Sequence, residues 1–195
     1  FQLTFGMVIY LAERPVVGET ILSYLHGGEE VDIIEVSKRN PELLARCIAY
    51  VLGRGYHRER LCRALVCLIN YAPSTYRGIA WSLIQEVPLS HLLYITRVIE
   101  KNKENSRRLR HALVNKIANS EEGEIIRAYF MATELFRRLF SYMYLPREVI
   151  NGNKITNKSY TLAYKLSTLS IPEALKELEL RPIDLVKAYR IPMHL

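Results

Sequence analysis

The chain has 195 residues, of which 49% are hydrophobic and 24% are charged, and its formal net charge is +7. This composition excludes a largely disordered protein, and three cysteines are too few for a disulfide scaffold. No apolar run reaches the roughly 18 residues that a membrane span needs. Glutamine is rare, whereas arginine, glutamate, isoleucine and tyrosine are abundant, a pattern typical of thermophile proteins.

Apolar residues recur at helical spacing from residue 41 onward, and no stretch shows the sustained period of two that marks a strand. Asn40-Pro41 places an N-cap residue before a proline at the first helical position, and Gly53 and Gly55 mark the end of the same helix. Later stripes and prolines predict further helix starts near residues 57, 73, 88 and 104. A residue followed by proline predicts an additional helix start at each of three later places, 171–172, 181–182 and 191–192.

Two later segments differ from these short helices. Aromatic and aliphatic residues share one face over Ile125–Met143, which predicts a longer helix. Residues 150–159 are polar and rich in turn formers, so we predict a mobile loop there.

The predicted helix starts lie about 15–16 residues apart, so a helix pair recurs about every 31–32 residues. This period is typical of helical-hairpin repeats, in which each pair buries an apolar face against the next pair. We therefore predict an all-α fold, a HEAT-like α-helical repeat solenoid whose antiparallel helix pairs form an arc or a partial ring. We expect residues 1–195 to form a single solenoid domain that is a fragment or a minimal form.

The positive charge is concentrated in two segments. Residues 101–116 hold six basic residues and one acidic residue, residues 54–63 hold four and one, and the remainder is close to neutral. Two basic patches on a neutral body indicate a polyanionic partner, and nucleic acid is the first to consider. The alternative is that both segments are solvated helix faces.

The second basic segment has the clearer pattern. On a helix, Arg107, Arg110 and Val114 share one face, and Arg108 and His111 lie beside it. Arginine guanidinium groups suit phosphate oxygens, and a row of them can follow a phosphate backbone. The candidate RNA-binding residues are Lys103, Arg107, Arg108, Arg110, His111 and Lys116 in this helix, Arg127, Arg137 and Arg138 in the next one, and Arg54 and Arg58 in the first segment.

Ser106 is expected to cap this helix and to present its N-terminal amides to a further phosphate. For the three arginines of the next helix, the alternative is ion pairing with Glu124 and Glu134. Three tyrosines in the same region could stack on bases, but their spacing favours core packing for most of them. These are Tyr129, Tyr142 and Tyr144.

Motifs for enzymatic chemistry are missing from the sequence. It has no glycine-rich phosphate loop, no His-Glu-x-x-His, no Gly-x-Ser-x-Gly and no Cys-x-x-Cys. His91 and His111 could act as an acid–base pair, but nothing in the sequence brings them together. Cys47, Cys62 and Cys67 lack the spacing of metal ligands and are expected to be core residues. We predict a protein of the reducing cytoplasm that is not an enzyme and has no cofactor and no metal.

Several segments resemble one RNA-binding family. Val87-Pro-Leu-Ser-His-Leu-Leu-Tyr-Ile95 is similar to the Ile-Pro-x-His-Leu helix start in the TROVE domain of Ro ribonucleoproteins. Ser106-Arg-Arg-Leu-Arg-His-Ala-Leu113 resembles the Gly-Arg-x-Leu-Arg-x-Ala pattern of the following helix in that family. The segments 31–37, 41–49, 122–146 and 185–195 are also similar, so the likeness covers most of the chain with gaps.

The resemblance implies a ring or arc of HEAT-like repeats that binds small noncoding RNA on its basic outer surface and single-stranded RNA ends through the ring. It implies a role in RNA quality control, with an exonuclease or another ribonucleoprotein component as partner. Arg107 and Arg110 match the family motif and inherit its RNA-contact role. The chain departs from the family in lacking a histidine within 134–144 and the Asp-x-Ser-x-Ser metal motif of the family's von Willebrand A-type domain.

Other functions are weighed against this one. The chief alternative is a HEAT-like protein-interaction scaffold without nucleic-acid binding, whose basic faces meet an acidic partner. Residues 71–85 could form a helix-turn-helix for double-stranded DNA, but Arg77 is the only charged residue there. A nuclease is disfavoured by the missing catalytic set, and we expect no membrane partner.

Overall fold

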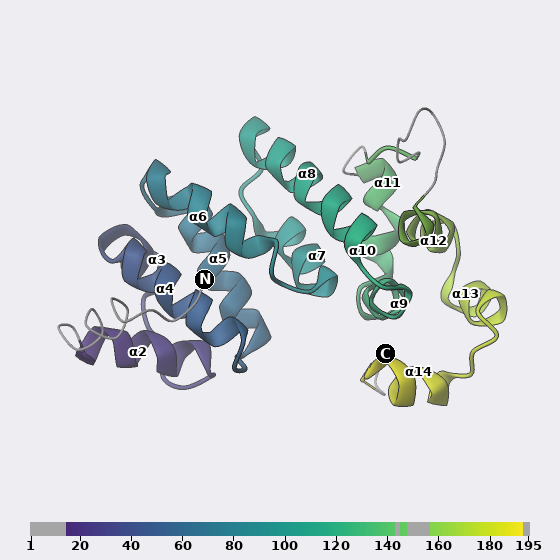
Figure 1. The fold of residues 1–195 in the computed structure, drawn as a ribbon, viewed down its shortest axis with the longest axis horizontal. Coiled ribbons are helices and arrows are strands. Elements are labelled where there is room, and N and C mark those ends of the chain that lie inside the picture. The colour runs from purple at the N-terminus through teal and green to yellow at the C-terminus, as the bar shows by residue number, and fades with distance from the viewer. Residues whose placement is uncertain (1–14, 143–144, 148–156, 193–195) are drawn as a thin grey trace. The chain divides into compact units, whose positions relative to one another are not determined.

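The computed structural model describes residues 15–142, 145–147 and 157–192, and these residues form helices, turns and loops without a strand (Figure 1). The protein is all-α, as predicted. No helix in the described part combines the length and the apolar character needed to cross a membrane. The chain divides into two compact units: unit 1 is Phe1–Val87 with Val98–Glu100, and unit 2 is Pro88–Arg97 with Lys101–Leu195. The single solenoid domain over residues 1–195 stays a prediction.

Unit 1 is organised by α5, which packs against each of the other described helices of the unit. Leu61, Leu65 and Leu68 recur at the spacing of one helix face and are fully buried. Burying each leucine side chain stabilises the fold by about 1.5–3 kcal/mol. The helices are α2 (Pro15–Leu25), α3 (Ile33–Arg39), α4 (Pro41–Leu52), α5 (Arg58–Tyr71) and α6 (Ser74–Ile84).

Unit 2 is organised by α12, which packs against α8, α9, α10 and α11. Its Tyr160, Ala163 and Leu166 are fully buried. The helices are α7 (Leu89–Val98, of which all but the last residue belong to unit 2), α8 (Lys103–Asn119), α9 (Glu122–Met131), α10 (Thr133–Arg137), α11 (Leu139–Tyr142), α12 (Lys158–Ser167), α13 (Ile171–Glu177) and α14 (Pro182–Tyr189).

The predicted helix starts are confirmed to within one residue for α4, α5, α6, α7 and α8. Pro41 occupies the first turn of α4. That helix ends at Leu52, and the following Gly55 has a φ of 112°, in the left-handed region that favours glycine. The starts predicted at 171–172 and 181–182 are also confirmed, whereas the one at 191–192 runs beyond the described residues.

The prediction of one long helix over Ile125–Met143 is wrong within the described residues. The backbone leaves the helical region at Ala132, where φ is −144° and ψ is 54°. The Thr133 hydroxyl donates to the Tyr129 carbonyl at 2.9 Å, a local bond that competes with the helical pattern. Tyr129 is fully buried and meets Phe136 edge-on with ring centroids 5.5 Å apart. Tertiary packing of these rings, which one-dimensional periodicity does not register, accompanies the break.

The first turn of α12 is joined to the end of α8 by the amide of Asn157. Asn157 Oδ1 accepts from the Tyr160 amide at 2.8 Å as an N-cap, and its Nδ2 donates to the Ala118 carbonyl at 2.8 Å. The Ser159 hydroxyl donates to the Ser120 carbonyl beside it. The amide of Asn157 therefore serves two helix ends at once. The predicted mobile loop at 150–159 lies outside the described residues over 150–156, and its last residues belong to this junction.

Replacing Asn157 tests this junction. Asn157→Ala removes the cap and the donor and should lower the free energy of unfolding by about 2 kcal/mol. Asn157→Asp keeps a capping oxygen but sets a carboxylate against a carbonyl, and should cost about 1 kcal/mol. Urea unfolding followed by circular dichroism measures both changes.

The matched control is Asn102→Asp at the N-cap of α8, where the side chain only accepts, from the Asn105 amide at 2.8 Å. A carboxylate is favourable at a helix N-terminus, so this variant should stay within about 0.5 kcal/mol of the wild type or gain stability. Equal effects of Asn102→Asp and Asn157→Asp would contradict the two-ended role of Asn157.

The three cysteines are free thiols in the core of unit 1, as predicted. Burial raises the pKa of Cys47 and Cys62 to about 12 and that of Cys67 to about 11. The charged thiolate is disfavoured because it loses its hydration in an apolar surrounding. The nucleophilic form is therefore scarce at neutral pH.

We expect these thiols to resist modification in the folded protein. At pH 8 a pKa near 12 instead of 9 lowers the thiolate fraction about a thousandfold, and burial restricts access further. An aromatic disulfide reagent such as DTNB should label all three in urea and none within the same time under native conditions. Stoichiometric labelling of the native protein on the timescale seen in urea would contradict this placement.

Candidate nucleic-acid interface

The strongest candidate interface is on α8, which begins at Lys103. Asn102 is the N-cap residue, with an extended backbone and a side chain that accepts from the Asn105 amide. The prediction that Ser106 caps this helix is wrong, because Ser106 lies in the helix, one turn after the cap. The observed cap is Asn102, so Lys103 is the first residue of the helix.

Three cations follow one line along α8. Lys103, Arg107 and Arg110 are spaced at i, i+4 and i+7, and all three are exposed. Within the described ranges, their charged groups make neither a hydrogen bond nor an ion pair. On another side of the helix, Leu109 and Leu113 are buried in unit 2. We call Lys103, Arg107 and Arg110 the α8 basic face.

Arg110, the last cation of this face, interacts electrostatically with a buried residue of α12. Tyr160 is fully buried, and its hydroxyl donates to the Pro146 carbonyl. Burial raises the pKa of Tyr160 to about 12, and the nearby positive charge of Arg110 opposes that rise. The α8 basic face therefore ends next to the packed α8–α12 contact, which holds the helix in place.

The remaining candidates on α8 are engaged or turned away. Arg108 Nε lies 3.4 Å from Glu104 Oε1, one turn earlier in the helix. His111 is exposed, and its Nε2 accepts from the Asn115 amide at 3.1 Å. Lys116 is half-buried on the side of the helix that packs into the unit. The structure thus brings His111 beside the basic face and separates Lys116 from it.

The arginines of α9 and α10 differ from one another. Arg137 Nη1 lies 3.5 Å from Glu134 Oε1, which confirms the ion-pair alternative for this arginine. Arg138 is exposed beside it. Arg127 is half-buried, and its Nε has no hydrogen-bond partner in the described part of the chain. These side chains do not form a second row like that of α8.

Glu124 has a different role from the predicted one. Its Oε1 accepts from the Leu89 amide at 2.7 Å, at the first residue of α7. A carboxylate at this position satisfies a free amide and is stabilised by the helix dipole. The partner lies 35 residues away in sequence, so no local pattern indicates it.

In the first basic segment, Arg54 folds back on the end of its own helix. Its Nη1 donates to the Tyr50 carbonyl at 3.0 Å, and its guanidinium lies 4.2 Å from the Tyr50 ring centroid. Arg58 is exposed at the start of α5. These two candidates belong to unit 1, whereas all the other candidates belong to unit 2.

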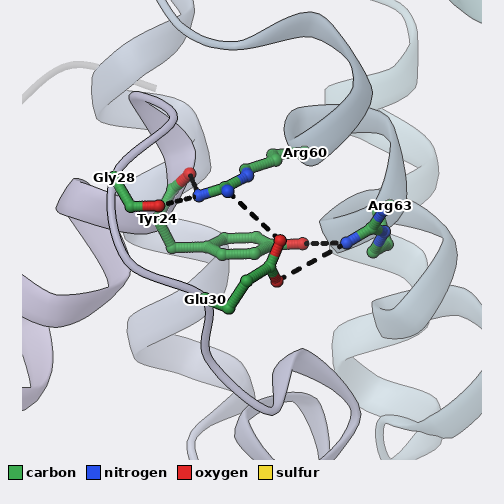
Figure 2. Close-up of polar contacts among 5 residues, drawn as sticks. All are labelled: Tyr24, Gly28, Glu30, Arg60 and Arg63. Carbon is green, nitrogen blue, oxygen red and sulfur yellow. Dashed lines mark hydrogen bonds and ion pairs between the residues drawn. The ribbon is translucent and has the colours of Figure 1, made fainter.

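The same segment contains a cluster that sequence analysis missed, formed by Tyr24, Gly28, Glu30, Arg60 and Arg63 (Figure 2). Arg60 Nη1 donates to the Tyr24 carbonyl at 3.2 Å and to the Gly28 carbonyl, and Nη2 donates to Glu30 Oε1 at 3.1 Å. Arg63 Nη1 lies 3.4 Å from the Tyr24 hydroxyl and 3.7 Å from Glu30 Oε2. We call these five residues the Arg60 cluster. Its partners lie 30 to 39 residues apart, so sequence spacing carried no signal of it.

The candidates for catalysis and base stacking are placed differently from the cations. His91 is 6% exposed, and its Nδ1 lies 3.3 Å from the Ser90 hydroxyl, whereas His111 is on the surface of α8. Tyr129 is buried and donates to the Leu169 carbonyl at 2.7 Å. The side chains of Tyr142 and Tyr144 lie outside the described part. Among the described residues, no group of three or more histidine, cysteine or acidic side chains could hold a metal ion.

The structure places residues 71–85, the helix-turn-helix candidate, at the end of α5 and in α6. Arg77, the only charged residue of this segment, donates from Nε to the Ala72 carbonyl at 2.8 Å, which ties it to the end of α5.

Comparisons with known proteins gave no match: no family model, no curated protein and no solved structure is similar to this chain.

A pair of substitutions on α5 distinguishes structural from exposed cations. Arg60→Ala leaves two carbonyls and a carboxylate without their donor and should lower the free energy of unfolding of unit 1 by about 1–3 kcal/mol. Arg58→Ala removes an exposed cation and should change it by less than about 0.5 kcal/mol. Fluorescence of Trp81, the only tryptophan, reports the urea unfolding of unit 1 from within α6. Equal effects of the two variants would contradict the structural assignment of Arg60.

Proposed function

We propose that this chain is an RNA-binding helical module of the Ro/TROVE type, which holds small noncoding or misfolded single-stranded RNA in RNA quality control. The observation that carries the proposal is the α8 basic face. Its three cations are exposed in a row and have no anionic partner among the described residues. A helix surface that keeps its cations unpaired is suited to an external polyanion.

The chemistry of the α8 basic face favours phosphate. Arg107 and Arg110 supply planar guanidinium groups that can each donate two parallel hydrogen bonds to phosphate oxygens. The three cations rise by about 6 Å and about 4.5 Å along the helix axis, so they can meet successive groups of an extended backbone. Contacts to phosphate set affinity and position without reading base identity. The module would therefore bind RNA with little dependence on sequence through this face.

The sequence resemblance points to the same two residues, because Arg107 and Arg110 are the positions that match the TROVE pattern. A HEAT-like repeat solenoid is the arrangement that the resemblance and the helix spacing support. An exonuclease or another protein of an RNA-processing complex is the protein partner that the same resemblance supports. These assignments are part of the proposal.

The test is the affinity for a labelled single-stranded RNA measured at several salt concentrations. Each phosphate contact to a single strand contributes about −0.7 to the slope of log K against log salt, so the three cations should give about −2. The double variant Arg107→Glu/Arg110→Glu should lose most of the affinity, and its slope should be flatter by at least about 1.4. Circular dichroism confirms that the variant is folded.

The matched control is Lys176→Glu/Lys187→Glu, which changes the net charge by the same amount on exposed positions of α13 and α14. It should reduce affinity far less. If both double variants bind like the wild type, the α8 basic face is not the RNA surface. If nuclease-treated wild-type protein binds no RNA at all, the proposal fails and the scaffold alternative takes its place.

A further inference from the structure

The Arg60 cluster contains a guanidinium that is fixed before any ligand arrives. Arg60 Nη1 is held by two backbone carbonyls, and its guanidinium lies 4.9 Å from the Tyr24 ring centroid. The Arg60 side chain is 15% exposed. Because these contacts hold one edge of the fork, the other edge faces the Glu30 carboxylate in a set orientation (Figure 2).

A second cation completes the cationic half of the cluster. Arg63 lies one turn after Arg60 on α5 and directs Nη1 toward both the Tyr24 hydroxyl and Glu30 Oε2. Tyr24 is fully buried, and its hydroxyl accepts from Arg63 Nη1, so this contact helps to orient the Arg63 guanidinium toward Glu30. Burial raises the pKa of Tyr24, which keeps that hydroxyl protonated.

The anionic half is held much less firmly than the cations. Glu30 belongs to the loop between α2 and α3, and its side chain is 66% exposed. Its two carboxylate oxygens are divided between the two arginines, at 3.1 Å and 3.7 Å. Because Glu30 is mostly exposed, its pairing with the two arginines is screened by water, and an external anion can compete with it for them.

We propose that Arg60 and Arg63 form a phosphate-binding site that Glu30 occupies in the free protein and that an RNA phosphate takes over by displacing Glu30. The inference rests on the proposed function, because RNA is the source of the phosphate. A phosphate group presents more oxygens than a carboxylate, so Nη2 of Arg60 and the guanidinium of Arg63 can bind several of them at once. Glu30 acts as an internal substitute for the ligand.

The first test uses inorganic phosphate, with chloride at matched ionic strength as the reference. Phosphate binding to unit 1 is measured from the shift of its Trp81 unfolding transition in urea, since a ligand that binds only the folded state stabilises it. Glu30→Gln removes the competing charge and should strengthen phosphate binding about fivefold, the factor that corresponds to about 1 kcal/mol for an exposed ion pair.

The matched control is Glu29→Gln, which removes the same charge from the neighbouring exposed residue, outside the cluster. It should leave phosphate binding at the wild-type level. Adding Arg63→Gln to Glu30→Gln should abolish the gain. Equal phosphate affinities of Glu29→Gln and Glu30→Gln would overturn the proposal, because the effect would then be one of net charge alone.

If Glu30→Gln fails to fold, Glu30→Asp keeps the charge but shortens the side chain, so it spans the two arginines less well and should also raise phosphate affinity. An affinity for phosphate equal to that of the wild type would overturn the proposal in that case.

The second test uses the labelled single-stranded RNA. Glu30→Gln should raise RNA affinity in the wild-type background and still raise it in Arg107→Glu/Arg110→Glu, because the cluster does not include α8. A gain for inorganic phosphate without a gain for RNA would overturn the assignment of RNA as the ligand. Failure of the α8 basic face is scored separately, by the Arg107→Glu/Arg110→Glu variant with Glu30 intact.

Discussion

Short helices leave many backbone groups without a partner in their own helix, and both units depend on side chains from distant segments to satisfy them. Arg60 reaches the last turn of α2, Glu124 reaches the first amide of α7, and Asn157 reaches the last turn of α8. The partners are 35 to 39 residues apart in sequence. Each bond completes one helix end and also joins it to another helix. The same polar groups therefore end the helices and fix their packing.

The difference between local signals and such long-range contacts explains which parts of the fold can be predicted from the sequence. Helix starts depend on prolines, local caps and apolar spacing, all of which act within one turn, so they are predicted to within one residue for α4 to α8. The break at Ala132 accompanies the packing of Tyr129 against Phe136, a tertiary contact, and the periodicity of their segment shows only a continuous stripe. The contacts of side chains such as Arg60 and Glu124 cannot be predicted from the residues next to them in the sequence, because their partners are far away along the chain.

In the candidate site, too, some features could be predicted from local spacing and others could not. Helical spacing alone was enough to predict that Arg107 and Arg110 share a face, and the structure places Lys103 on the same line, one turn before Arg107. Net charge was a poorer guide. Two of the four arginines in 54–63 are in the Arg60 cluster, so part of the charge density that the sequence shows there is compensated by Glu30 inside unit 1.

An arginine with a fixed internal partner and an arginine with none serve different purposes. Lys103, Arg107 and Arg110 have no internal anion among the described residues, so they attract a polyanion at long range but must be ordered when it binds. Arg60 is already ordered by backbone carbonyls, so little conformational entropy is lost when a phosphate binds there. The phosphate has only to displace the weakly held Glu30. A protein that holds RNA without reading its sequence gains from both kinds of contact, because one supplies capture and the other supplies a defined position.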